Sequence, residues 1–159
     1  MKYLTINTFN KIPLTKNSLV LCDIDDTLIT TKIICLKPKK INSTKPNIKL
    51  VVPTYIDKNG FTNLLQRLEV TDSKLYFITS RNESSTEFTV NQFKLLNIDI
   101  NTYPILYCGT SHKSNIVKQF IDTNSYDNII FIDDLIYNIR NMKKEFGDKV
   151  SCFLFKKLD

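Results

Sequence analysis

Two groups of aspartates in this sequence come directly behind apolar runs. Asp23, Asp25 and Asp26 follow one run in the stretch SLVLCDIDDTLI, and Asp133 and Asp134 follow another in NIIFIDD. Carboxylates so close to a buried segment are destabilising unless a positive charge meets them. Oxygen ligands of this kind favour Mg²⁺. The alternative is that each aspartate caps a following helix, which is a frequent use of this residue.

The elements that would position these carboxylates follow an alternating pattern. In residues 59–70, for example, Phe61, Leu64, Leu65 and Leu68 recur at helical spacing. Nearly unbroken apolar strands that alternate with such helices predict a parallel sheet covered on both faces. We therefore expect an α/β fold, a Rossmann-like three-layer sandwich around a mainly parallel five-stranded sheet. The predicted strands are residues 19–23, 74–79, 104–108, 128–133 and 150–155, and the predicted helices are 59–70, 83–97, 113–122 and 135–146.

The carboxyl ends of the predicted strands carry further polar residues. Parallel α/β sheets bind their ligands outside these ends. Thr79, Ser80 and Arg81 follow the strand 74–79, so they would join the two acidic groups at one edge of the sheet. Because carboxylates from two strands repel each other, we expect a divalent cation to hold them together. The sequence thus predicts a magnesium site beside a site for an anion.

The composition is that of a globular protein and indicates which classes of protein to exclude. The chain has 159 residues, of which 42% are hydrophobic and 24% charged, as in an ordinary globular protein. We expect one domain spanning residues 1–159. No apolar run approaches the length of a membrane span, and the first residues lack a signal peptide's apolar core. We therefore predict no membrane partner and a cytoplasmic location, in the host cell if the protein is viral. The four cysteines show no CxxC spacing, so we expect reduced thiols and no zinc site.

The net charge of +6 belongs to one segment of the chain. Residues 28–56 hold six lysines and no acidic residue, while the rest of the chain has 16 basic and 16 acidic side chains. Within it, residues 30–56 are rich in proline, threonine and asparagine and predict a basic hairpin followed by a loop. This segment either attracts polyanionic substrates or is a solvated loop enriched in lysine by an AT-rich genome. The lysines are Lys32, Lys37, Lys39, Lys40, Lys45 and Lys49.

Four motifs in order resemble those of the haloacid dehalogenase-like (HAD) superfamily, over nearly the whole chain. Residues 23–27, DIDDT, resemble the DxDx[TV] first motif, and Thr79 resembles the residue that closes the second. Lys113, at the start of HKSNIVKQFI, is placed like the third-motif lysine, although a surface lysine is the alternative. The stretch IIFIDD resembles the acidic fourth motif. Asp26 departs from the pattern, since glycine is commonest there.

The resemblance implies a Mg²⁺-dependent phosphomonoester hydrolase. Asp23 would attack phosphorus and become an aspartyl-phosphate. Asp25 would protonate the leaving oxygen and later deprotonate the attacking water. Dehalogenases of this superfamily lack the second aspartate, so Asp25 indicates phosphoryl transfer.

The resemblance also implies two sets of ligands. The first would hold Mg²⁺ through side chains and the main-chain carbonyl of Asp25, with Asp133 as an accessory ligand. The second would bind the phosphoryl oxygens and offset their charge. The implied metal ligands are Asp23, Asp25, Asp134 and Asp133, and the implied phosphate-binding residues are Thr79, Ser80 and Lys113.

The spacing of the motifs leaves no room for a folded cap domain. Only 55 residues separate Asp23 from Thr79, and the interval from Thr79 to Lys113 fits one helix and one strand. We therefore expect an uncapped member with an open site. In this superfamily open sites are associated with large substrates, such as phosphoproteins or nucleic-acid ends. The alternative is a non-catalytic protein of this fold that binds an anionic partner through its lysine-rich segment.

Overall fold

The structure is a computed structural model that describes residues 2–36 and 48–158, and the side chains of 2–33 and 51–158. In this part of the chain, six parallel strands form one sheet in the order β1-β8-β7-β2-β5-β6. The five predicted strands are present, each within one residue of its expected bounds. The sixth, β1, was missed because three residues are too few to show a period. The strands are β1 (Leu4–Ile6), β2 (Ser18–Cys22), β5 (Lys74–Thr79), β6 (Ile105–Tyr107), β7 (Asn128–Asp133) and β8 (Val150–Phe155).

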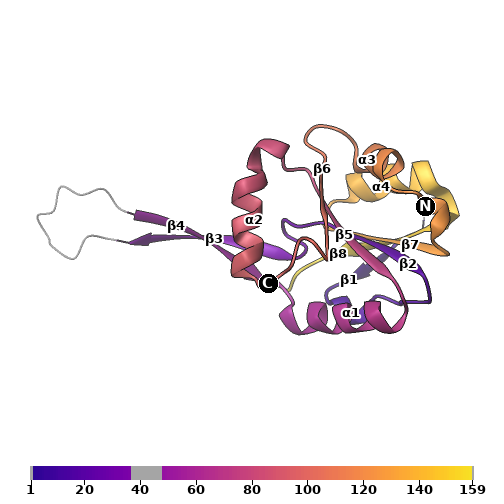
Figure 1. The fold of residues 1–159 in the computed structure, drawn as a ribbon, viewed down its shortest axis with the longest axis horizontal. Coiled ribbons are helices and arrows are strands. Elements are labelled where there is room, and N and C mark those ends of the chain that lie inside the picture. The colour runs from indigo at the N-terminus through magenta and orange to yellow at the C-terminus, as the bar shows by residue number, and fades with distance from the viewer. Residues whose placement is uncertain (1, 37–47, 159) are drawn as a thin grey trace, which may run out of the picture.

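Helices cover both faces of this sheet (Figure 1). On β2, Val20 and Cys22 belong to the apolar cluster shared with α1 and α2, whereas Leu19 and Leu21 belong to the cluster shared with α3 and α4. Burying each aliphatic side chain of this kind stabilises the fold by about 1.5–3 kcal/mol. The predicted α/β three-layer sandwich is therefore confirmed. The helices are α1 (Lys58–Val70), α2 (Thr86–Leu95), α3 (Lys113–Phe120) and α4 (Ile136–Phe146), with short 3₁₀ turns at Phe9–Lys11, Glu83–Ser85, Thr123–Ser125 and Gly147–Lys149.

A separate antiparallel hairpin follows β2. Its strands, β3 (Ile29–Leu36) and β4 (Ile48–Tyr55), pair with each other and project from the body of the molecule (Figure 1). The hairpin predicted after the first core strand is confirmed. The loop predicted in the basic segment falls on residues 37–47, which lie outside the described residues. Among the six lysines of that segment, only Lys32 has a described side chain, and it is exposed.

The register of the central strands brings the candidate residues to one edge. Cys22 of β2 pairs with Phe77 of β5 on one side and with Ile132 of β7 on the other. The next residue, Asp23, donates its main-chain N–H to the Ile132 carbonyl at 3.0 Å. Asp23 therefore lies at the carboxyl edge between the ends of β5 and β7, where parallel sheets bind ligands.

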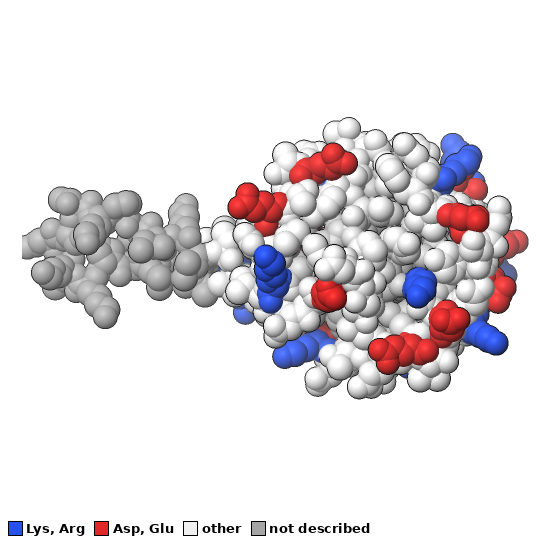
Figure 2. Space-filling model, in the orientation of Figure 1, with Lys and Arg blue, Asp and Glu red and all other residues white. Residues whose placement is uncertain are grey.

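The outer surface of the body carries charges of both signs. On the face shown in Figure 2, acidic and basic side chains are interspersed. This distribution agrees with the equal numbers of basic and acidic residues outside the lysine-rich segment. Among the described helices, none combines the length and the apolar character needed to cross a bilayer.

Candidate active site

Three carboxylates from two neighbouring strands meet at the carboxyl edge of the sheet. Asp23 follows β2, Asp133 ends β7 and Asp134 comes next in the chain. Each offers an oxygen atom, and these atoms lie within 4.8 Å of one another. Asp23 is 6% exposed and Asp133 is fully buried, while Asp134 is partly buried. The sequence prediction that these three residues converge agrees with this geometry.

A buried lysine lies among these carboxylates. Lys113, the first residue of α3, is 3% exposed and places its Nζ 2.7 Å from Asp23 Oδ1 and 2.7 Å from Asp133 Oδ2. Burial by itself would lower the pKa of Lys113, but the two carboxylates outweigh it and raise this pKa. Lys113 therefore stays protonated and offsets part of the charge of the cluster. The alternative of a surface lysine is wrong.

Asp23 is held in place from two sides. Besides the contact with Lys113, its Oδ2 accepts a hydrogen bond from Thr27 Oγ1 at 3.0 Å. The Thr27 hydroxyl also lies 3.5 Å from Asp134 Oδ1, so it bridges the two carboxylates. Burial raises the pKa of Asp23 well above its ordinary value, and the neighbouring Asp133 raises it further, while Lys113 opposes the change. The site thus has too little positive charge for its carboxylates.

The two acidic residues after β7 differ in their surroundings. Asp133 Oδ1 accepts from Leu135 N at 2.9 Å, and both its oxygens lie near Asn138 Nδ2, at 3.2 and 3.1 Å. With Lys113 as a further donor, Asp133 has most of its acceptor capacity engaged by the protein. Among the described contacts, Asp134 accepts no comparable set of hydrogen bonds, and burial raises its pKa. Asp23 and Asp134 are therefore the carboxylates best able to accept an external ligand.

The side chain of Asp25 lies outside the carboxylate cluster. It forms a two-point ion pair with Arg81, with Nε to Oδ2 at 2.9 Å and Nη2 to Oδ1 at 2.7 Å. Arg81 Nη1 is held in turn by Thr89 Oγ1 at 3.1 Å and Gln92 Oε1 at 2.6 Å on α2. The Asp25 side chain is 50% exposed, whereas that of Arg81 is 12% exposed. The Asp25 carboxylate is thus half exposed, and Arg81 holds it against α2.

The remaining predicted site residues lie around this edge. Thr79, at the end of β5, is buried, and its Oγ1 accepts from Arg81 N at 3.1 Å. Ser80 is exposed. Asp26 has a φ of +60°, in the left-handed region that glycine adopts most freely. Aspartate is among the residues that adopt this conformation most readily.

Sequence reasoning missed three supporting residues. Thr27 belongs to the DIDDT motif, but the resemblance assigns its hydroxyl no role. Asn138 could have been suspected, because it lies in the first turn of the helix that follows Asp133 and Asp134. Arg81 was noted only as a polar residue behind a strand. Its pairing with Asp25, 56 positions away in the sequence, depends on the fold.

The cluster has the chemistry expected of a Mg²⁺ site. Its ligand atoms are carboxylate oxygens alone, the type that Mg²⁺ prefers. Asp23 and Asp134 retain acceptor capacity, and the single ammonium group of Lys113 offsets only part of the charge of the three carboxylates. The residues present therefore fit a divalent cation held by Asp23 and Asp134, with Asp133 behind them.

Comparison with known proteins extends the fold assignment. No protein-family model matches the chain, and no curated protein matches it. A solved structure described as "Structure of Pnkp1/Rnl/Hen1 complex" contains a similar chain, with a TM-score of 0.57 and 15% identity. The match covers 97% of this chain and 51% of that chain, so this chain spans about half the length of its neighbour. At this identity the likeness shows the fold alone.

Proposed function

We propose that the protein is a Mg²⁺-dependent phosphomonoester hydrolase that acts through an aspartyl-phosphate on Asp23. The observation that carries the proposal is the meeting of Asp23, Asp133, Asp134 and Lys113 at the carboxyl edge of a parallel sheet. Such an edge is where α/β folds bind their ligands. The order of the motifs that resemble the HAD superfamily supports the same chemistry.

The reaction has two steps. In the first, an oxygen of Asp23 bonds to phosphorus, the bond from phosphorus to the substrate oxygen breaks, and Asp25 gives a proton to that oxygen. Asp25 takes up this proton from solvent when its carboxylate leaves the ion pair with Arg81. In the second, water attacks phosphorus and yields a proton to Asp25. The bond between Asp23 and phosphorus then breaks and releases inorganic phosphate. The half-exposed position of Asp25 supports this role, because a leaving group arrives from the open side.

Lys113, Thr79 and Ser80 would bind the phosphoryl oxygens. An ammonium group has three donors, and among the described contacts Asp23 and Asp133 engage two of those of Lys113. The third is left for an oxygen of the phosphoryl group. A Mg²⁺ ion held by Asp23, the Asp25 carbonyl and Asp134 would offset the negative charge of the reacting group.

The substrate class follows from the open site. The 55 residues between Asp23 and Thr79 contain the hairpin and α1, both described above, and we propose that one uncapped domain leaves the site open to large substrates. A phosphoprotein or a nucleic-acid end would fit this description. The similar solved chain belongs to a complex of several components, which is compatible with a macromolecular partner.

An aryl phosphate assay with and without Mg²⁺ tests the proposal. We expect hydrolysis only by the wild type with Mg²⁺, and a loss of at least about a thousandfold in Asp23→Asn. Asp148→Asn, which removes an exposed carboxylate in the 3₁₀ turn after α4, is the matched control and should keep wild-type activity. Equal background rates for wild type and Asp23→Asn, with and without Mg²⁺, would favour a non-catalytic binding protein.

A further inference from the structure

Two exposed rings lie at the rim of the candidate site. His112 directly precedes Lys113, and Tyr137 is the second residue of α4, three positions after Asp134. Their ring centroids are 5.7 Å apart, and the Tyr137 hydroxyl lies 3.3 Å from His112 Nδ1. The two exposed rings are therefore held together beside the candidate site.

The exposed ring of Tyr137 begins a polar stripe along α4. Arg140, Asn141 and Lys144 follow it at i+3, i+4 and i+7, which places them on the same face of the helix. Asn141 Nδ2 lies 3.2 Å from His112 Nδ1, so the ring pair and the stripe are continuous. The opposite face of α4 is buried through Asn138, Ile139 and Met142.

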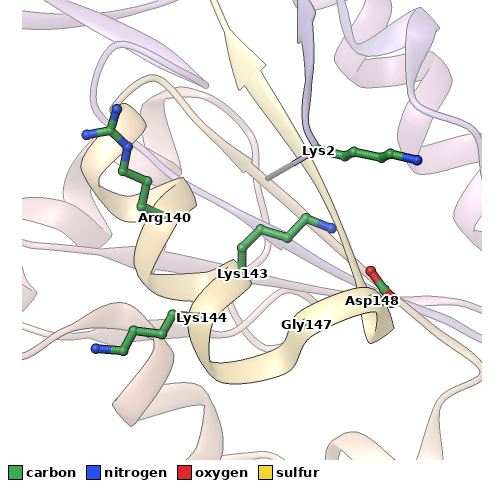
Figure 3. A pocket seen from close by; sticks show the side chains of 6 residues that line it. All are labelled: Lys2, Arg140, Lys143, Lys144, Gly147 and Asp148. Atoms are coloured by element: carbon green, nitrogen blue, oxygen red, sulfur yellow. The ribbon is translucent and has the colours of Figure 1, made fainter.

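The stripe ends beside a basic hollow of about 650 Å³. Figure 3 shows Arg140 and Lys144 projecting from one side of α4, and Lys143 from the other, towards Lys2 and Asp148. No ion pair within the described residues involves Arg140 or Lys144. Both cations are therefore available to an external anion.

We propose that this stripe, from the His112–Tyr137 pair to Lys144, binds a nucleic-acid strand whose phosphorylated end reaches Asp23. This inference rests on the proposed hydrolase function and names its substrate class. Aromatic rings that stack bases, followed by cations that meet phosphates, are the features by which proteins bind single strands. Seven residues of helix extend the stripe by about 10 Å beyond the rim. A phosphopeptide brings its one phosphate to Asp23 and has no further phosphates for Arg140 and Lys144.

Binding of a labelled, unphosphorylated oligothymidylate, followed by fluorescence anisotropy, tests the surface independently of hydrolysis. Tyr137→Leu should weaken binding by about tenfold, and Tyr137→Phe should retain it. Log affinity falls with log salt, and the double variant Arg140→Gln/Lys144→Gln should make this slope less negative by about 1.4. The control Lys16→Gln/Lys74→Gln removes two exposed lysines that lie off the stripe and should behave as wild type. Thermal unfolding checks that each variant is folded.

Hydrolysis assays then distinguish the proposed strand-binding surface from the proposed hydrolase function. With 3′- and 5′-phosphorylated oligothymidylates, Tyr137→Leu should lose about tenfold in kcat/KM, and its loss in kcat/KM for glycerol phosphate should be much smaller. Stripe variants that match the control on both substrates overturn the strand surface and leave the hydrolase standing. Weakened oligonucleotide binding with no hydrolysis of any phosphoester upholds the surface and overturns the hydrolase. A phosphopeptide that is the better substrate and depends equally on the stripe overturns the nucleic-acid assignment.

Discussion

Replacing Lys113 by methionine tests whether this lysine holds the acidic cluster together. Lys113 Nζ lies 2.7 Å from both Asp23 and Asp133, and all three side chains are nearly or fully buried. At an effective dielectric constant of about 20, each contact corresponds to about 6 kcal/mol of attraction. Two carboxylate oxygens less than 4.8 Å apart repel each other by at least about 3.5 kcal/mol on the same scale. Desolvation of the ammonium group offsets several kcal/mol of the attraction.

The effect of Lys113→Met on the free energy of unfolding depends on the two carboxylates that lose their counter-charge. Methionine fills a similar volume, but Asp23 and Asp133 then remain buried without a counter-charge. Removing one partner of a buried ion pair destabilises proteins by about 3–5 kcal/mol. We expect that loss in the free energy of unfolding, measured by urea titration without divalent cations and followed by circular dichroism.

A lysine on the same helix provides the control. Lys118 pairs with Glu145 at 2.8 Å, but its side chain is 69% exposed. Lys118→Met should therefore change the free energy of unfolding by about 0–1 kcal/mol. If Lys113→Met proves as mild as Lys118→Met, the buried triad does not stabilise the fold and the electrostatic reasoning is wrong.

Three further outcomes are expected. Saturation with Mg²⁺, at a hundred times its Kd, should raise the free energy of unfolding by about 2.7 kcal/mol, and Asp134→Asn should lose most of this gain in urea titrations. Gly60→Ala should destabilise the fold by about 1–3 kcal/mol in the same assay, because its Cβ would lie 2.0 Å from Asp57 Oδ2. Burial raises the pKa of Cys108 and of Cys152 to about 11, so only about a thousandth of each is thiolate at pH 8. Iodoacetamide should therefore label their peptides slowly in the native protein and rapidly in urea, as followed by mass spectrometry.

The sheet was predictable because its central strands β2 and β7 are buried on both faces. Strands such as 74–79 and 128–133 are continuous apolar runs, and their bounds agree with the structure. Strand β1 was not predicted because its three residues are too few to show a period. Helix α2 was predicted three residues early, since its 3₁₀ turn at 83–85 continues the same polar composition.

The sequence predicts the site residues that directly follow a strand of the parallel sheet, but not the contacts between their side chains. In a parallel sheet every strand delivers its next residue to the same edge, so the sequence could place Asp23 and Asp133 together. It could not show that Arg81 engages the Asp25 carboxylate at two points. That contact depends on how α2 packs and on Thr89 and Gln92, which hold the guanidinium.

Charge balance connects the candidate site to its proposed substrate. Three ionised carboxylates and one lysine give the cluster a formal charge of −2, and burial raises the pKa of both Asp23 and Asp134. A phosphomonoester dianion would be repelled by such a cluster. A bound divalent cation makes the cluster formally neutral, and the donor of Lys113 left over from its described contacts can then attract the phosphoryl group. Inorganic phosphate should therefore bind this site only when Mg²⁺ is present, and calorimetric titration that detects equal phosphate affinity without Mg²⁺ would contradict this order.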